Sequence, residues 1–142
     1  MLIAVLDGMG GGLGSQVVAQ LTAQMGEKVE VIALGTNALA TNNMVRAGAS
    51  RGATGENAVR VSLRRADIIV GPIGIVIPNA MMGEITPLIA EIVASSDASK
   101  ILIPVNQNHF IIVGLEAKPL VTQIREAVAR VAEIVREKEG KL

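Results

Sequence analysis

The chain has 142 residues, a length that suits one domain. Its 13 basic and 13 acidic residues give no net charge, and the sequence has no basic stripe that would bind nucleic acid or an anionic membrane. It has no Cys and one His, which excludes disulfides, thiolate or histidine-rich metal centres and a cysteine nucleophile. No signal-peptide pattern or membrane-length apolar run is present, so we expect a cytoplasmic protein with a single domain over residues 1–142.

The hydrophobic residues are almost all aliphatic, since the chain has one Phe and neither Tyr nor Trp. Long aliphatic runs are typical of a parallel sheet that helices cover on both faces. The composition therefore predicts an α/β fold with an aliphatic core.

Strands and helices alternate in the first third of the sequence. Apolar runs that end near glycine predict strands, and apolar residues at helical spacing predict helices between them. The expected elements are a strand over Leu2–Leu6, a helix over Ser15–Met25, a strand over Val29–Leu34 and a helix over Ala38–Ala47. Gly52 and Gly55 then mark a loop.

Residues Glu56–Ala66 fit two patterns. Their apolar residues alternate with polar ones as in a half-exposed strand, yet Val59, Leu63 and Ala66 also share one helical face. We favour a helix, because a strand here would leave too few residues for a crossover to the next parallel strand. Thr54 is the expected cap of that helix.

The second half of the sequence continues with shorter apolar runs and one long amphipathic segment. The expected elements are a strand over Ile68–Val70, a helix that begins at Pro87 behind a Thr86 cap, a strand over Ile101–Val105, a polar turn over Asn106–Asn108, an antiparallel strand over Phe110–Val113 and a final helix over Pro119–Glu139.

These elements predict a three-layer Rossmann-like fold with a mostly parallel sheet of about five strands. The expected strand order is 2-1-3-4-5, with the last strand antiparallel and a C-terminal helix. In this order the chain changes direction between the first and third strands, and a ligand crevice is expected where their carboxyl ends meet. The loops there are Asp7–Gly14 and Gly71–Gly74.

The glycine loop after the first strand has the composition of a phosphate site. Main-chain N–H groups at the start of a helix favour an anion, and the positions that would supply them are Gly8, Gly10, Gly11, Gly12, Leu13 and Gly14. The spacing G-x-x-x-G-x-G resembles the phosphate loop of short-chain dehydrogenases, although Asp7 stands where those enzymes usually carry Thr. Without Tyr, the chain cannot supply the Tyr-x-x-x-Lys pair of that family. A merely tight turn is the alternative.

The candidate residues for a sugar and a base are Thr36, Asn37, Gly71 and Gly74. Dinucleotide folds usually place an acidic residue after the second strand to bind the ribose, and its absence here argues against strict use of NAD. Arg46 or Arg51 could instead meet the 2′-phosphate of NADP, or both could be solvated surface residues. NADP and NAD are thus candidate cofactors, the sequence leaves the identity of the ligand open, and Gly71–Gly74 could also simply turn the chain.

The candidate acids and bases are Asp7, Glu56, Glu84, Lys100 and His109. Asp7 could bind Mg²⁺ or a ribose, or it could cap its own glycine turn. Asn79–Glu84 could form a lid or a subunit contact, but core packing of Met81 and Met82 is the simpler expectation. No catalytic motif or metal-ligand spacing stands out, so we assign no catalytic residue and no metal, and the chain need not be an enzyme.

The segments DGMGGGLG, IALGTNALAT, GATGENA, DIIVGPIGI, GEITP and KILIPVN together resemble a family of short bacterial proteins known only as a domain of unknown function. The resemblance spans Leu2–Gly114 and implies a Rossmann-like fold with no activity attached. We expect a protein that binds a nucleotide or a phosphorylated metabolite through Gly8–Gly14. The alternative is a regulatory or scaffold module without a nucleotide, which exposes its final helix or Ile75–Met82 to a partner and could form a homodimer.

Overall fold

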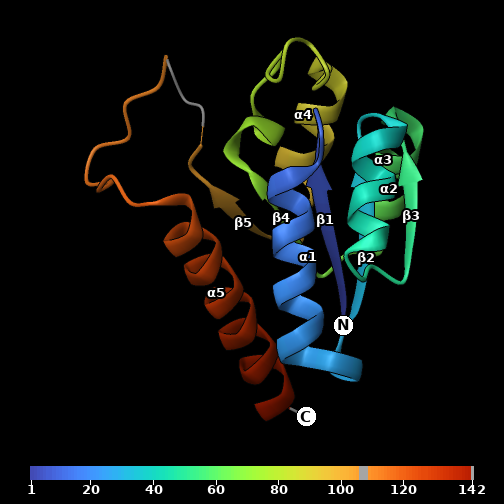
Figure 1. The fold of residues 1–142 in the computed structure, drawn as a ribbon, viewed down its shortest axis with the longest axis vertical. Helices are drawn as coiled ribbons and strands as arrows, with labels where there is room; N and C mark the ends of the chain where they lie inside the picture. Colours follow the sequence, from blue (N-terminus) through green and yellow to red (C-terminus); the bar gives the residue numbers. More distant parts are fainter. Residues whose placement is uncertain (106–108, 142) are drawn as a thin grey trace.

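A computed structural model of the protein describes residues 1–105 and 109–141 and contains a twisted five-stranded sheet (Figure 1). All strand pairs are parallel, and the order is β3-β2-β1-β4-β5. The strands are β1 (Leu2–Asp7), β2 (Glu30–Gly35), β3 (Arg51–Thr54), β4 (Ile68–Pro72) and β5 (Ser99–Ile103). The carboxyl ends of the strands therefore lie along one edge of the sheet.

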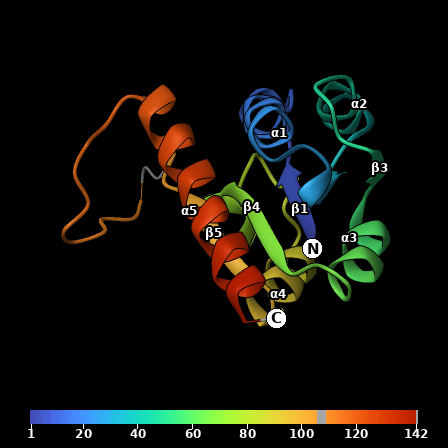
Figure 2. The ribbon, with the colours of Figure 1, turned by 90° about the horizontal axis from the view of Figure 1, so that it is seen from below.

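Helices cover both faces of this sheet, which gives three layers (Figure 2). One face carries α1 (Gly12–Met25), α2 (Ala38–Arg46) and α5 (Leu120–Gly140), and the other carries α3 (Glu56–Leu63) and α4 (Pro87–Ser95). Two short 3₁₀ helices, η1 (Gly26–Lys28) and η2 (Ile73–Val76), follow α1 and β4. None of the helices in the described part of the chain is long and apolar enough to span a membrane.

The core consists of two aliphatic clusters, one on each side of the sheet. Alternate residues of β1 enter opposite clusters, so that Ile3 and Val5 face α1, whereas Ala4 and Leu6 face α3 and α4. All four of these side chains are fully buried. This pattern explains why β1 reads as a continuous apolar run and confirms the α/β fold that composition predicts.

The prediction of an antiparallel last strand is wrong. Residues Phe110–Val113 form no strand, and the fifth strand is instead β3, within a segment interpreted as a loop. The four other predicted strands do occur in their expected relative order, as β2, β1, β4 and β5. The predicted polar turn over Asn106–Asn108 lies outside the described residues.

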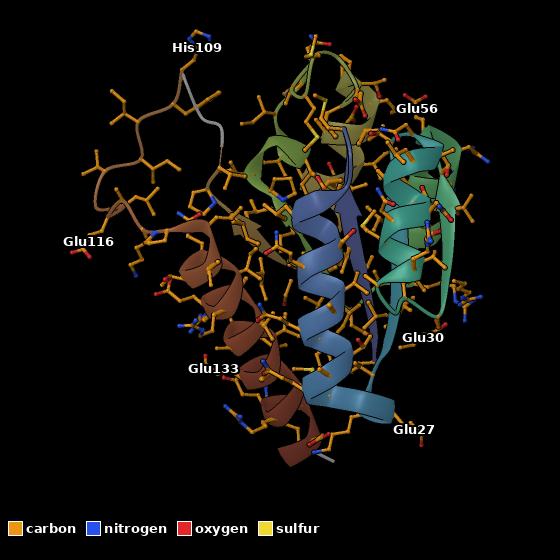
Figure 3. All side chains as sticks on the ribbon, viewed as in Figure 1. Glu27, Glu30, Glu56, His109, Glu116 and Glu133 are labelled. Carbon is orange, nitrogen blue, oxygen red and sulfur yellow. The ribbon has the colours of Figure 1, made fainter. Side chains whose placement is uncertain are left out.

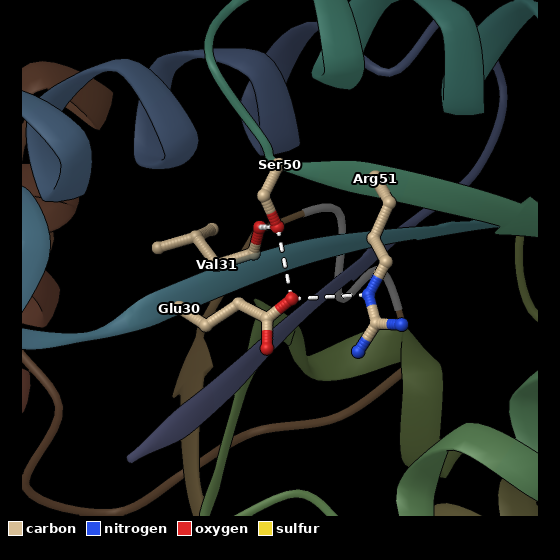
Figure 4. Close-up of polar contacts among 4 residues, drawn as sticks. All are labelled: Glu30, Val31, Ser50 and Arg51. Carbon is tan, nitrogen blue, oxygen red and sulfur yellow. Dashed lines mark hydrogen bonds and ion pairs between the residues drawn. The ribbon is translucent and has the colours of Figure 1, made fainter.

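The missed strand β3 is short, polar and located at an edge of the sheet. Its first residue, Arg51, makes an ion pair with Glu30 of β2 at 3.0 Å, and the Ser50 hydroxyl donates to the same carboxylate at 3.1 Å (Figure 4). These contacts join the amino ends of β2 and β3. An edge strand buries little apolar surface, so the apolar pattern that reveals a central strand is missing here.

The ambiguous segment after β3 is a helix, as favoured from the sequence, and it ends at Leu63. Its cap is Gly55 and not Thr54, whose hydroxyl lies 2.7 Å from that of Thr41. The cap predicted for α4 is confirmed, because the Thr86 hydroxyl oxygen accepts a hydrogen bond from the N–H of Ile89 at 3.1 Å.

Residues 109–119, here called the strap, precede α5 and have neither helix nor strand. The strap extends sideways from the β5 end of the sheet, away from the other loops at the carboxyl edge (Figures 1 and 2). It follows that the apolar run Phe110–Val113 lies outside both aliphatic clusters.

Candidate functional site

The two predicted loops meet at the carboxyl edge, because β1 and β4 are neighbours in the sheet. Gly71 packs so closely on β1 that a Cβ at this position would overlap the carbonyl oxygen of Leu6. Gly74 lies beneath Ala80, whose Cβ would be 3.3 Å from an added Cβ. Both glycines are thus placed next to the glycine loop, and both have close protein neighbours.

A buried carboxylate organises the inner part of the glycine loop. One oxygen of Asp7 accepts a hydrogen bond from the N–H of Gly8, and the other accepts one from the N–H of Gly14, both at 2.8 Å. Asp7 is the last residue of β1, and Gly14 lies in the first turn of α1. The carboxylate therefore caps its own turn, which was one of the alternatives that the sequence left open.

Burial raises the pKa of the Asp7 carboxyl, and the nearby negative charge of Glu84 adds to this effect. The hydrogen bonds from Gly14 and Gly8 oppose the shift, because they stabilise the ionised form.

Gly14 explains how the helix comes so close to this carboxylate. A Cβ on Gly14 would lie 2.6 Å from the sulfur of Met44 and 2.9 Å from the Cβ of Asp7. Gly11 is also needed for the backbone, since its φ of 72° is left-handed. These two glycines have structural reasons that do not involve a ligand.

A second carboxylate covers the outer side of the loop. One oxygen of Glu84 accepts three hydrogen bonds, from the N–H of Met9 at 2.9 Å, the hydroxyl of Thr36 at 2.5 Å and the side-chain amide of Asn37 at 2.8 Å. The bond from Thr36 is the largest cause that lowers the pKa of the Glu84 carboxyl. The polar side chains predicted for a sugar are therefore bound to Glu84.

The turn Asn79–Ile85 brings Glu84 to this position. Asn79, Met81 and Met82 have left-handed φ values of 65°, 56° and 56°, which cost side-chain-bearing residues about 1 kcal/mol each. Buried Ile85 anchors the turn to the core beneath. The prediction that both methionines pack in the core is wrong for Met82, which is 92% exposed, whereas Met81 is half-buried over Gly8.

The other part of the loop is open. Among the described residues, no hydrogen-bond acceptor meets the main-chain N–H groups of Gly10, Gly12 and Leu13. A Cβ placed on Gly10 or Gly12 would find no atom within 4 Å. Because Gly12 and Leu13 begin α1, their N–H groups point out of a helix N-terminus toward free space.

A cavity of about 720 Å³ lies beside the start of α1, where Leu13 forms part of its lining. Its lining is mostly apolar and comes from α1, from the residues after β5, from the strap and from the start of α5, with Leu13, Val105, Phe110, Ile112 and Leu120 among the apolar residues. Its polar members are Glu116, Lys118 and Gln123. The volume lies within the range of small-molecule sites in proteins.

Other candidate residues are dispersed. Arg51 pairs with Glu30 at the amino end of β3, and Arg46 ends α2, so both lie at the opposite edge of the sheet and cannot meet a ligand at the glycine loop. Both are exposed, as in the alternative that they are solvated surface residues. Lys100 donates to the carbonyl oxygens of Ser96 and Ala98 near the amino end of β5.

The remaining two candidates also lie apart from the loop. His109 occupies the outer end of the strap, and Glu56 is exposed at the start of α3 (Figure 3), where it accepts a hydrogen bond from Thr86 at 2.5 Å. Within residues 1–105 and 109–141, no three His, Asp or Glu side chains gather so that they could hold a metal ion.

The family model for a domain of unknown function (DUF3842) matches residues 2–136. The chain belongs to this family. The sequence blocks that carried the resemblance are thus confirmed as those of a DUF3842 protein. No curated protein matches this DUF3842 chain.

Among solved structures, the DUF3842 chain is similar to a dodecameric FMN-dependent Ubix-like decarboxylase from Escherichia coli O157:H7. The two share 16% sequence identity with a TM-score of 0.51, and the match covers 98% of this chain and 94% of that chain. This similarity confirms the Rossmann-like fold.

Sequence reasoning missed two parts of this DUF3842 site. The contact of Glu84 with the loop depends on the left-handed turn before it, for which the only signal was a glycine at position 83. The cavity beside Leu13 depends on the strap, whose apolar run was interpreted as a strand.

Proposed function

We propose that the protein binds a nucleotide-type ligand, with its phosphate on the main-chain N–H groups of Gly10, Gly12 and Leu13. The observation that carries this proposal is that these groups lack an acceptor at the N-terminus of α1, next to a largely apolar cavity. A helix N-terminus with free N–H groups is well suited to a phosphate. The phosphate therefore binds the open part of the loop, and the N–H groups of Gly8 and Gly14 stay bound to the Asp7 carboxylate.

A mononucleotide suits this site better than a dinucleotide. Thr36 and Asn37, which would have to hold a second sugar, already donate to Glu84. The cavity beside Leu13 instead offers one apolar space for a single ring. NAD or NADP thus has less support than a mononucleotide.

Flavin mononucleotide is the specific ligand that we propose first. The solved neighbour is FMN-dependent, and the chain shares its fold. In this chain the open N–H groups suit the phosphate, and the apolar side chains of Phe110, Ile112 and Leu115 suit a ring system. When bound, a flavin would supply an electron-accepting ring. The role of this chain's own residues is to hold the phosphate and shield the ring from water.

A second candidate function is a scaffold that acts through a protein partner and binds no nucleotide. The observation that favours it is the exposed apolar surface of the strap. The final helix is a weaker candidate for that contact, because its apolar residues Ile124, Val128 and Val131 are buried against the sheet.

The direct test is ligand binding by the purified protein. Because the chain has no Trp and no Tyr, a near-ultraviolet or visible band after dialysis comes from a bound ligand. Titration with FMN, followed by flavin fluorescence, should show saturable binding, and titration with NAD and NADP separates the other cofactors.

The matched variants are Gly12→Val and Gly140→Val. Both glycines have room for a side chain and ordinary φ values, but only Gly12 belongs to the open part of the loop. We expect Gly12→Val to weaken binding about tenfold, because the added side chain takes up space in the open part of the loop although the N–H is kept, and Gly140→Val to have no effect. Equal affinity of the two variants contradicts the phosphate assignment.

A further inference from the structure

The strap and the start of α5 expose an unusual run of apolar side chains. The exposed fractions are 53% for Phe110, 95% for Ile111, 42% for Ile112, 95% for Val113, 49% for Leu115, 39% for Leu120 and 56% for Val121. These seven residues, here called the strap surface, include the single aromatic residue of the chain. They lie together on one side of the molecule, beyond the β5 end of the sheet (Figure 1).

The area of the strap surface is that of a protein interface. With ordinary full areas for these residue types, the exposed fractions add to roughly 800 Å², which is about the share of one partner in a standard interface. Soluble monomers rarely expose a contiguous apolar patch of more than a few hundred Å². An exposed apolar surface of this size therefore indicates a contact with another molecule.

No described part of the same chain covers this surface. The run Phe110–Val113 has the residue types of a strand but no strand partner within the described residues. Ile111 and Val113 are almost completely exposed, so they contribute almost nothing to the fold of the single chain. A second molecule has to supply the cover.

A groove of about 320 Å³ lies directly beside the strap, between β5 and α5. Its apolar lining includes Ile101, Leu102, Ile103 and Ala127. The strap contributes Gly114 and Leu115 to the same groove, whose lining also includes the charged residues Glu116, Lys118, Glu126 and Arg130. A protruding apolar segment and a groove with an apolar part are thus neighbours on one side of the protein. This arrangement is what a twofold contact needs, because each copy then offers a segment and receives one.

The charges near the strap disfavour a membrane as the partner. The strap carries Glu116 and Lys118 and thus no net charge, and Lys118 is paired with Glu126 of α5 at 2.8 Å. An interfacial segment that binds anionic lipid usually carries an excess of basic residues. The strap lacks that excess.

We propose that the strap surface is the contact through which two copies of this chain associate, with the strap of each copy packed into the groove between β5 and α5 of the other. This inference goes beyond nucleotide binding. The strap surface shares Phe110, Ile112 and Leu115 with the cavity beside Leu13, and Ile111 also lines that cavity, so assembly is tested without nucleotide. The contact buries the apolar side chains that the single chain leaves in water.

The test is the molar mass of the full-length protein without added nucleotide, measured by light scattering and sedimentation velocity over a range of concentrations. We expect the wild type to assemble, and the double variant Ile111→Glu with Val113→Glu to show half the mass or less at a concentration where the wild type is fully assembled. Since both side chains are almost completely exposed, the variant should keep the circular dichroism spectrum of the wild type and unfold in one cooperative transition.

The matched control is Leu39→Glu, because Leu39 is 60% exposed on α2, away from the strap. It should assemble like the wild type. A wild type that is monomeric at every concentration, assembly that survives the double variant, or equal dissociation of the control would each overturn the proposal. So would a monomer that sediments with phosphatidylserine vesicles. Gly12→Val should assemble normally, so failure of nucleotide binding and failure of assembly remain distinguishable.

Discussion

The two parts of the glycine loop use the same residue type for different purposes. In the closed part, Gly8 and Gly14 donate to the buried Asp7 carboxylate, and an added Cβ would collide with protein atoms. In the open part, Gly10 and Gly12 face free space, and their N–H groups meet no acceptor within the described residues. A glycine-rich sequence alone does not separate these purposes, but the space around each Cβ does.

The difference also corrects a common inference from such loops. A carboxylate of the protein already occupies the place where a phosphate is usually expected in a tight strand-to-helix turn. Asp7 thus makes the closed part a structural element, and ligand binding is left to the first two residues of α1 and the residue before Gly11. The following substitutions test this division.

Asp7→Ala should have the largest effect. It leaves the N–H groups of Gly8 and Gly14 without an acceptor, and a buried unpaired N–H costs about 1–3 kcal/mol. We expect a loss of about 2–4 kcal/mol in the free energy of unfolding, measured with urea. Asp7→Asn is the control, because it keeps one acceptor and removes a charge that burial disfavours, and it should lose clearly less. Equal losses in both variants would show that a single acceptor is not enough to hold the loop.

Gly14→Ala should destabilise the protein by about 1–3 kcal/mol, because its Cβ would press on Met44 and Asp7. Gly10→Ala is the matched change in the open part and should stay within about 0.5 kcal/mol of the wild type. Urea unfolding of the pair measures the contrast directly. Similar values for the two variants would contradict the division of the loop.

Glu84→Gln should have a smaller effect that depends on pH. The lowered pKa of Glu84 means that the ionised group stabilises the fold above the ordinary glutamate value of 4.5, and that this contribution is lost as the pH falls through the folded pKa. We expect a difference of less than about 1 kcal/mol at neutral pH, since solvent screens the group.

Urea unfolding at several pH values should show this difference shrinking below pH 4.5. The raised pKa of Asp7 acts in the opposite direction, because stability is gained as the pH falls from the raised value toward the ordinary one. Glu84→Gln removes the contribution of the Glu84 charge to the raised pKa of Asp7 but leaves the larger contribution of burial, so the second trend persists in weaker form. A difference that does not change with pH would mean that the Glu84 charge is not what holds the turn.

Gly12→Ala should have the smallest effect on stability. The new methyl group has free space and the backbone φ is ordinary, so we expect no loss, or a gain of about 0.5 kcal/mol from the stiffer unfolded chain. FMN titration should nevertheless show weaker binding than in the wild type, because the methyl group takes up free space in the open part of the loop. A thermal-melt comparison with and without FMN checks both outcomes. Unchanged affinity would place the phosphate elsewhere.

The sequence predicted the central elements because burial alone determines their pattern. The strands β1, β2, β4 and β5 are apolar runs, and four helices carry apolar residues at regular spacing. The edge strand β3 was missed since its sequence, Arg-Gly-Ala-Thr, buries little and is held by main-chain bonds and by Glu30. The run Phe110–Val113 was predicted to be a strand because it is apolar like a buried strand, but its side chains are exposed and have no cover within the described chain.

The candidate site was predicted in outline and not in detail. The convergence of Gly8, Thr36 and Gly74 follows from the strand order, which the sequence supports. The role of Glu84 could not be predicted, because it depends on a turn with three left-handed residues that carry side chains, two of which are methionines. Local preference disfavours such a turn, and it is held by the packing of Ile85 beneath it and by the hydrogen bonds that Glu84 accepts.

The all-parallel sheet also has a consequence for synthesis on the ribosome. Two parallel strands cannot be joined by a hairpin, so β1 pairs with β2 only after α1 has emerged. The other edge of β1 stays unpaired until β4 has been made. When synthesis has reached the end of β3, the sheet consists of β3, β2 and β1, and the apolar strand β1 is unpaired along one edge. We expect this intermediate to need a chaperone or rapid translation of the next segment, and the whole domain to refold in milliseconds or longer.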